Sequence, residues 1–153
     1  MELTNNSFTG QSNYTLDAKG RINIPAKMRK ALSPVNDRTF VATRGPDPCI
    51  VLYPMEVWQQ IEKKLINLNK RRVLHRHYTR NFVRHAEIVQ YDQQGRIPVP
   101  TELIEYAGID KGVEIVGMID HIEIWDPDRL TEYSQQFENR ADELDAIADE
   151  IFS

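Results

Sequence analysis

The sequence contains one cysteine, no long apolar run and no leading pattern of a secretory signal. Cys49 has no partner for an intrachain disulfide, which agrees with a reducing compartment. It lies in an apolar run, where we expect a buried, inert thiol rather than a nucleophile. Without a span of membrane-crossing length or a signal pattern, we expect a cytoplasmic protein with no membrane partner.

Motifs for catalysis and for cofactors are also missing. The chain has no nucleophile motif, no glycine-rich phosphate loop and no paired cysteines. His75 and His77 lie two residues apart among cations, and residues at that spacing do not share a helix face. We therefore expect no metal site, no cofactor, no small-molecule substrate and no enzyme activity.

Acidic residues are scarce in most of the chain and concentrated at its end. Residues 1–119 hold 17 Lys and Arg against 12 Asp and Glu, for a net charge of +5. Residues 120–153 hold 2 against 11, for a net charge of −9. The segment 63–85 has eight Lys and Arg, three His and no acid. For this segment a solvated helix face or a contact with a neighbouring subunit is favoured over a contact with DNA.

One short pattern occurs twice. Residues 17–25 and 92–100 share Asp, Gly, Arg and a final Pro at a constant spacing of 75 positions. Such a repeat indicates a chain of two related halves. Each half has only about 50–60 residues, a size at which a separate core is marginal. We therefore expect the halves to share a core, exchange elements or assemble with other chains.

The pattern predicts a tight turn in each half. Asp17 and Asp92 follow β-prone residues, and an aspartate side chain can accept a hydrogen bond from an N–H two residues later. Gly20 and Gly95 fall where a hairpin needs a positive φ, a conformation that glycine adopts without strain.

Two arginines follow these turns. In the strand after each turn, Ile22 and Ile97 are predicted to face the core, so Arg21 and Arg96 face the opposite way. An isolated Asp–Arg pair that only holds a turn would contribute about 0–1 kcal/mol. Two copies on polar strand faces favour a function instead. The planar guanidinium suits both phosphate and guanine, and the sequence leaves open which of them it contacts.

The fold class predicted is α+β, with the same order of elements in both halves. Each half reads as strand, turn, strand, short helix, two strands and a longer helix. Asp126 and Pro127 are predicted to start the last helix, whose apolar stripe continues to the end of the chain. The expected divisions are a first half at residues 11–58, a basic connecting helical segment at 59–85, a second half at 86–129 and an acidic C-terminal helix at 130–153.

The doubled Asp-x-x-Gly-Arg pattern, Phe8-Thr9-Gly10 ahead of it and Leu52-Tyr53-Pro54 with Trp58 after it resemble the MraZ family. These are bacterial transcriptional regulators built from two SpoVT-AbrB-like halves, and the resemblance covers about residues 8–137. It implies a swapped-hairpin-type β-barrel with flanking helices. It also implies ring-shaped homo-oligomers that bind tandem repeats in double-stranded DNA upstream of the cell-wall and division gene cluster.

The resemblance also implies which residues lie at the DNA-binding face. The residues expected to contact DNA are Lys19, Arg21 and Arg96. Those expected to position the motif are Asp17, Gly20, Asp92 and Gly95. Gln94 stands where the first copy has Lys19, so the two copies differ in charge.

Two functions from different classes follow. The first is a sequence-specific DNA-binding transcriptional regulator, cytoplasmic and associated with the nucleoid. The alternative is an antitoxin-like protein-interaction module that uses the acidic C-terminal helix. An enzyme comes third.

Overall fold

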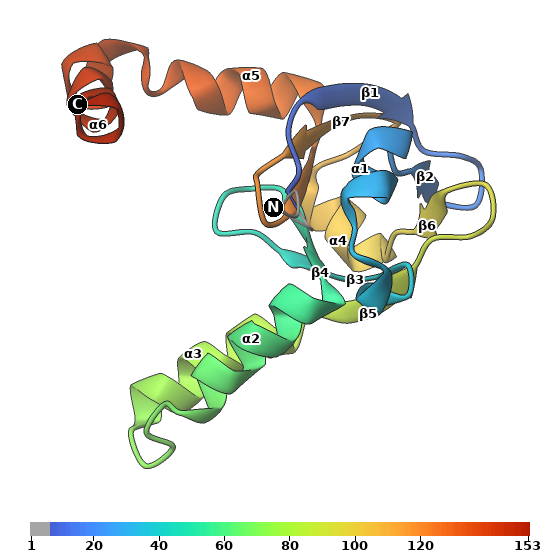
Figure 1. Cartoon of the computed structure of the whole chain (residues 1–153), viewed down its shortest axis with the longest axis horizontal. Coiled ribbons are helices and arrows are strands. Elements are labelled where there is room, and N and C mark those ends of the chain that lie inside the picture. Colours follow the sequence, from blue (N-terminus) through green and yellow to red (C-terminus); the bar gives the residue numbers. More distant parts are fainter. Residues whose placement is uncertain (1–6) are drawn as a thin grey trace.

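The computed structural model describes residues 7–153 and shows one order of elements twice (Figure 1). The first half comprises β1 (Gln11–Thr15), β2 (Arg21–Asn23), α1 (Ala26–Ala31), the 3-10 turn η1 (Pro34–Asn36), β3 (Thr39–Arg44), β4 (Ile50–Pro54), α2 (Met55–Ile66) and α3 (Val73–Val83). The second comprises β5 (Glu87–Gln90), β6 (Arg96–Pro98), α4 (Thr101–Ala107), β7 (Gly112–Gly117), β8 (Ile122–Trp125), α5 (Pro127–Gln135), the 3-10 turn η2 (Glu138–Arg140) and α6 (Ala141–Phe152). The predicted α+β class and the repeated order are confirmed.

The two halves are interleaved. Six strands form one antiparallel sheet in the order β1-β7-β8-β4-β3-β5, and β2 pairs with β6 in a separate two-stranded sheet. The first strand of each half therefore joins a strand of the other half, β1 with β7 and β5 with β3. Exchanging equivalent strands leaves the order unchanged, so the fold has a pseudo-twofold axis. This is the exchange of elements expected for two halves of marginal size.

The predicted hairpins are wrong as strand pairs. Across residues 7–153, β1 and β2 do not pair with each other, and neither do β5 and β6. A local turn does form, but beyond it each strand finds its ladder partner in the other half. The two-stranded sheet and the six-stranded sheet are separate. Over the described residues, hydrogen bonds between strands therefore do not close a barrel. A sequence repeat predicts that the chain has two similar halves. It does not predict which half supplies the partner of each strand.

The core is common to both halves. Apolar side chains from the strands of each half form one buried cluster, together with residues of α1 and α4. Ile22 and Ile97 are paired directly in the β2–β6 ladder and are both buried. Phe8, from the segment before β1, is buried against Phe40 of β3 with ring centroids 6.4 Å apart. Cys49 is buried, as expected for an inert thiol.

The helix boundaries follow their local chemistry. Gly108 ends α4 with φ +66°, as a left-handed C-terminal cap does. Asp126 caps α5 by accepting a hydrogen bond from the N–H of Arg129 at 3.0 Å, with Pro127 in the first turn. The predicted continuous C-terminal helix is wrong, because the chain breaks between α5 and α6 at η2. No glycine or proline marks this break. Phe137 turns there to pack edge-on against Tyr133, with ring centroids 5.4 Å apart.

The segment 59–85, predicted to be basic and helical, contains α3, but only part of the apolar face of α3 is covered. Phe82 stacks on the buried Trp58 of α2 at 5.6 Å, so α2 and α3 lie side by side (Figure 1). Leu74 and Tyr78, on the same face of α3, are 70% and 59% exposed. Within residues 7–153 no helix has both the length and the apolar character needed to cross a bilayer.

Candidate nucleic-acid interface

The first Asp-x-x-Gly-Arg turn is held by one carboxylate. Asp17 Oδ1 accepts hydrogen bonds from the main-chain N–H groups of Lys19 and Arg21, both at 2.9 Å. Its Oδ2 accepts a third from Arg21 Nε at 2.8 Å. Gly20 completes the turn with φ +73°, a conformation that side chains disfavour. Asp17 therefore fixes both the main chain and the guanidinium of Arg21.

The second turn repeats this arrangement. Asp92 Oδ1 accepts from the N–H groups of Gln94 and Arg96, at 2.9 and 3.0 Å. Its Oδ2 accepts from Arg96 Nε at 3.2 Å. Gly95 has φ +81°. Identical chemistry at two places 75 positions apart shows that the repeat is a repeat of geometry as well as sequence.

Each turn is fastened to the strand that follows the other turn. The main-chain oxygen of Gly20 accepts a hydrogen bond from Val99 N–H at 3.0 Å, and that of Gly95 accepts one from Ile24 N–H at 2.8 Å. These two bonds are equivalent under the pseudo-twofold axis. They continue the short β2–β6 ladder at both ends, so one turn lies at each end of the ladder, on the same side of the molecule (Figure 1).

The side chains of the two arginines lie on one face of this ladder. Ile22 and Ile97 lie opposite each other and are buried, so their neighbours Arg21 and Arg96 lie on the other, solvent-facing side. Arg96 also approaches the first motif, with its Nη1 4.0 Å from Asp17 Oδ2. The pairing of β2 with β6 thus joins two distant sequence motifs into a single basic site.

Hydrogen bonds keep the carboxylates of this site ionised. The pKa of Asp17 lies below its ordinary value, chiefly because the main-chain N–H of Arg21 donates to it, with further donation from the Arg21 side chain. The pKa of Asp92 is lowered in the same way, chiefly by the main-chain N–H of Arg96. The ionised carboxylates orient the arginines without adding groups that bind a partner.

The outer ends of the arginines remain available. Each guanidinium uses Nε to bind its aspartate, and both side chains are partly exposed. Within residues 7–153 no hydrogen bond engages the Nη groups of Arg21 or Arg96, and their one ion pair is the 4.0 Å approach of Arg96 Nη1 to Asp17. A guanidinium fixed through Nε and open at Nη can donate two parallel hydrogen bonds to a planar acceptor, such as a guanine edge or a phosphate.

Arg29 is a third arginine at this site, and no sequence motif marks it. It lies on α1 of the first half and donates from Nε to the main-chain oxygen of Ile24 at 3.0 Å. Its guanidinium covers Gly95 of the second half, where an added Cβ would lie 2.6 Å from Arg29 Cζ. The contact crosses between the halves, so nothing in the local sequence indicates it.

The charge of the site is unequal in its two halves. The helix after the first motif, α1, carries Lys27, Arg29 and Lys30 and no acid. The equivalent helix after the second motif, α4, carries Glu102 and Glu105 and no base. Lys19 is exposed in the first turn, at the position where the second turn has a neutral side chain. The first half therefore supplies most of the positive field.

The histidines form local pairs rather than a metal site. His85 Nδ1 contacts Glu102, and His121 Nδ1 contacts Asp120 at 2.7 Å, although the sequence alone indicates no partner for either histidine. Within the described part of the chain, no three His, Cys, Asp or Glu side chains are grouped as metal ligands. Burial raises the pKa of the Cys49 thiol, which agrees with an unreactive cysteine.

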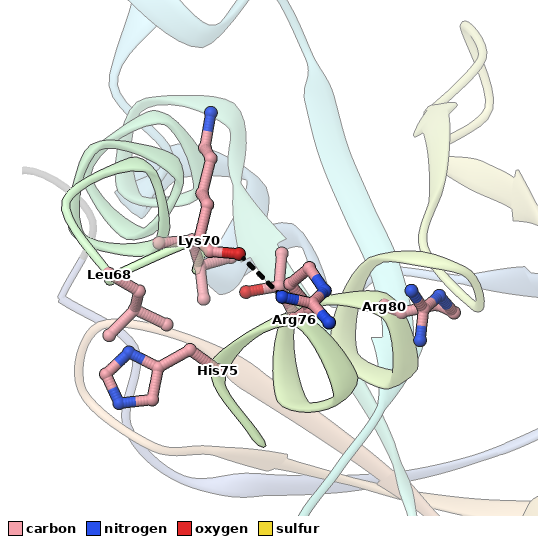
Figure 2. Close-up of a pocket in the computed structure, with 7 residues that line it drawn as sticks. Leu68, Lys70, His75, Arg76 and Arg80 are labelled. Atoms are coloured by element: carbon pink, nitrogen blue, oxygen red, sulfur yellow. Dashed lines mark hydrogen bonds between the residues drawn. The ribbon is translucent and has the colours of Figure 1, made fainter. Parts of the chain in front are cut away.

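A cavity of about 280 Å³ lies near the tip of the α2–α3 hairpin (Figure 2). Its lining residues are Leu65, Leu68, Lys70, His75, Arg76, Thr79 and Arg80. Arg76 Nη1 donates to the main-chain oxygens of Lys70 and Arg71, at 2.9 and 3.1 Å, which closes the loop between the helices. His75 Nδ1 accepts from the N–H of Asn69 at 3.0 Å. Part of the basic segment therefore serves to hold this loop.

Fold and site together define a tandem-repeat α+β protein whose interleaved halves present a matched pair of arginine-bearing turns. The model of the family described as MraZ protein, with an antitoxin-like designation, matches twice, at residues 7–81 and 82–151. The chain belongs to the MraZ family.

Close relatives carry one name. The protein "Transcriptional regulator MraZ" of Syntrophomonas wolfei is 42% identical over 137 residues, which cover 90% of this chain and 93% of the relative. Proteins of the same name from Natranaerobius thermophilus and Halothermothrix orenii are each 40% identical, over 90% and 94% of this chain and 96% and 98% of their own. The shared name describes a regulator of transcription.

Proposed function

We propose that this protein is a sequence-specific DNA-binding regulator of transcription that contacts DNA through the face of the β2–β6 ladder. The observation that carries the proposal is the convergence of Arg21 and Arg96 on one exposed face, each held by an aspartate through Nε. Two guanidinium groups related by a pseudo-twofold axis suit double-stranded DNA, whose backbone has local twofold symmetry. The names of the relatives support the same class of function.

Each residue has a separate role in the proposal. Arg21 and Arg96 contact base edges or phosphates, and Lys19 adds a phosphate contact on the more basic side. Asp17, Gly20, Asp92 and Gly95 position these contacts. Arg29, which packs on the second turn, supports that position and adds positive charge.

Assembly extends the site. One copy presents a small basic face, so a homo-oligomer, with a ring as the expected form, would bind tandem repeats far more tightly than a single repeat. The proposed target is a set of repeats upstream of its own cell-wall and division gene cluster. The protein would then act in the cytoplasm, at the nucleoid.

The direct test is affinity for a duplex carrying one repeat, measured by fluorescence anisotropy. Arg21→Ala and Arg96→Ala are each expected to cost about 1–3 kcal/mol of binding free energy. Lys19→Ala is expected to weaken all duplexes alike and to reduce the slope of log K against log salt by about one. Arg71→Ala, which removes one charge at the tip of the α2–α3 hairpin, is the matched control. Equal losses in all four variants would mean that only total charge matters.

An antitoxin-like protein-interaction module is the second candidate. It is favoured by α6, an acidic helix that is exposed throughout. A stoichiometric protein partner of a different sequence that is lost on deletion of residues 138–153 would support this candidate. If Arg21→Ala and Arg96→Ala weaken DNA binding as the first proposal expects, that result would count against this candidate.

A further inference from the structure

The C-terminal helix α6 has an apolar stripe that nothing in the described chain covers. All of residues 138–153 are exposed. Leu144, Ile147 and Ile151 are 52%, 53% and 66% exposed and recur at helical spacing, so they form one face. A helix with such a stripe normally buries it against another surface.

The rest of α6 is strongly negative. Between Ala141 and Phe152 the helix has five acidic residues and no basic one (Asp142, Glu143, Asp145, Asp149 and Glu150). DNA phosphates repel such a helix, so α6 is not part of the DNA-binding face. A surface that accepts it must be apolar along its floor and positive at its rim.

The chain offers a surface of this kind beside α3. A groove of about 990 Å³ lies between α3 and the turn after β3. Leu74, Tyr78 and Phe82 recur every four residues along α3 and form its apolar wall. The exposure of Leu74 and Tyr78 in the free chain shows that this wall is also left uncovered.

The charge of the groove complements that of α6. Arg44, His77, Arg84 and His85 line it, and none of its lining residues is acidic. Arg44 contacts Glu102, which partly offsets its charge, whereas Arg84, directly after α3, has no acidic partner within residues 7–153. The groove is thus apolar along one wall and positive at its rim.

Comparing the halves shows why α6 is free. In the first half the helix after α2 folds back, and Phe82 of α3 stacks on Trp58 of α2. In the second half Tyr133 of α5 packs on Trp125 instead, with ring centroids 5.4 Å apart, and α6 extends away from the body (Figure 1). The α5–α6 and α2–α3 pairs project from the body at separate places (Figure 1). A contact between α6 and the groove therefore requires two copies.

We propose that α6 of one copy docks by its apolar stripe in the groove beside α3 of a second copy. The contact is head-to-tail, because it joins two different surfaces, and it produces a ring if the rotation closes and an open chain if it does not. It rests on the homo-oligomer of the proposed function and assigns its interface. The contact needs no DNA, so it can be tested without it.

Two substitutions at exposed positions are designed to disrupt the contact, one in the groove and one on α6. Leu74→Glu places a negative charge in the groove, against an acidic helix, and Ile147→Lys places a positive charge on α6, against a basic groove. Val35→Glu, at another exposed apolar position outside the groove, is the matched control. Mass is measured by light scattering after gel filtration without DNA, and circular dichroism checks the fold.

The wild-type chain and the Val35→Glu control are expected to share one oligomeric mass, and both blocked variants are expected to lose it. Mixing the two blocked variants leaves one intact α6 and one intact groove, so they should combine into a complex of no more than twice their separate mass. A monomeric wild type, an unchanged mass in either blocked variant, or no complex on mixing would overturn the proposal.

The same samples separate this inference from the proposed function. Loss of mass with an unchanged affinity of Leu74→Glu for a single repeat supports the docking. Unchanged mass with weakened single-repeat binding would mean that the groove faces DNA, and would overturn it. If Arg21→Ala and Arg96→Ala leave DNA affinity intact while the blocked variants lose mass, the proposed function fails and the docking stands.

Discussion

At the scale of single residues, each motif aspartate acts on both the main chain and the side chain of the arginine four residues later. Asp17 and Asp92 each accept two main-chain N–H groups and one guanidinium N–H. A carboxylate close to DNA would by itself repel phosphate. Its use here is to fix the direction of Arg21 and Arg96 before any partner arrives, which lowers the entropy lost on binding.

The titration of these carboxylates is the first prediction. Asp17 and Asp92 should titrate below the ordinary aspartate value of 3.8, because N–H donors favour the charged form. A carboxyl with a lowered folded-state pKa contributes stability that is complete above the unfolded value and is lost as the pH falls through the folded value. Carbon-13 NMR titration of the carboxyl groups measures this directly. Values at or above 3.8 would contradict the observed bonding.

The second prediction concerns the motif glycines. Gly20→Ala and Gly95→Ala both place a side chain at positive φ, which costs about 1–2 kcal/mol. Gly95→Ala should cost more, because its Cβ would displace the Arg29 guanidinium, whereas Gly20 has only a main-chain oxygen at 4.0 Å. Chemical denaturation gives the free energies of unfolding.

A double-mutant cycle isolates the Arg29 contact. In an Arg29→Ala background, Gly95→Ala and Gly20→Ala should cost about the same. If Gly95→Ala stays the more costly of the two in that background, the close approach of Arg29 is not the cause.

At the scale of elements, the β2–β6 ladder is short, although it joins the two halves and carries both motif arginines. It has three residue pairs, and its central pair, Ile22 with Ile97, joins the two halves at the pseudo-twofold axis. The arginines are held on this ladder, so the geometry of the site depends on packing beneath it.

The third prediction follows from that pair. Ile22→Ala and Ile97→Ala should each lower the free energy of unfolding by about 2–5 kcal/mol, because both side chains are buried and their removal leaves a cavity. Val35→Ala, at an exposed position, should change it by about 0.5 kcal/mol or less. Similar values for buried and exposed sites would show that the ladder adds little to the core.

The elements also show what the sequence predicts and what it does not. The order of strands and helices in each half was predicted correctly, and Asp126 with Pro127 marked the start of α5. These features depend on neighbours in the chain. Pairing between distant strands does not, so the strands on either side of Gly20 and Gly95 do not form the hairpins that the sequence suggested.

The break between α5 and α6 was missed because the apolar spacing continues through Tyr133, Phe137 and Ala141, as in an unbroken helix. The chain nevertheless leaves the α-helix at η2, and no glycine or proline marks the position. Of the site, the sequence predicted the motif residues as a repeat. Arg29 could not be predicted, because its contact with Gly95 exists only once the halves interleave.

At the scale of the whole molecule, interleaving makes one folding unit of two repeats. Each half gives its first strand to the other, and the core contains side chains from both. Neither half can satisfy the hydrogen bonds of its own sheet alone.

The fourth prediction tests this dependence. Residues 7–81 and 82–151, prepared as separate chains, should each lack the circular dichroism of folded β-structure and should gain it on mixing in equal amounts. Independent folding of either chain would mean that its first strand can pair within its own half, contrary to the observed register. The intact chain is the reference.

The proposed function depends on the paired arginines, on the ladder that holds them and on assembly of several copies. One DNA titration tests it most directly. Duplexes carrying one, two or four copies of a repeat from upstream of this gene are titrated at two salt concentrations, with Arg21→Ala/Arg96→Ala alongside and its fold checked by circular dichroism. We predict an affinity that rises steeply with repeat number and disappears in the folded double variant. Weak binding that is indifferent to repeat number and to the arginines would contradict a regulator that contacts DNA through its paired turns.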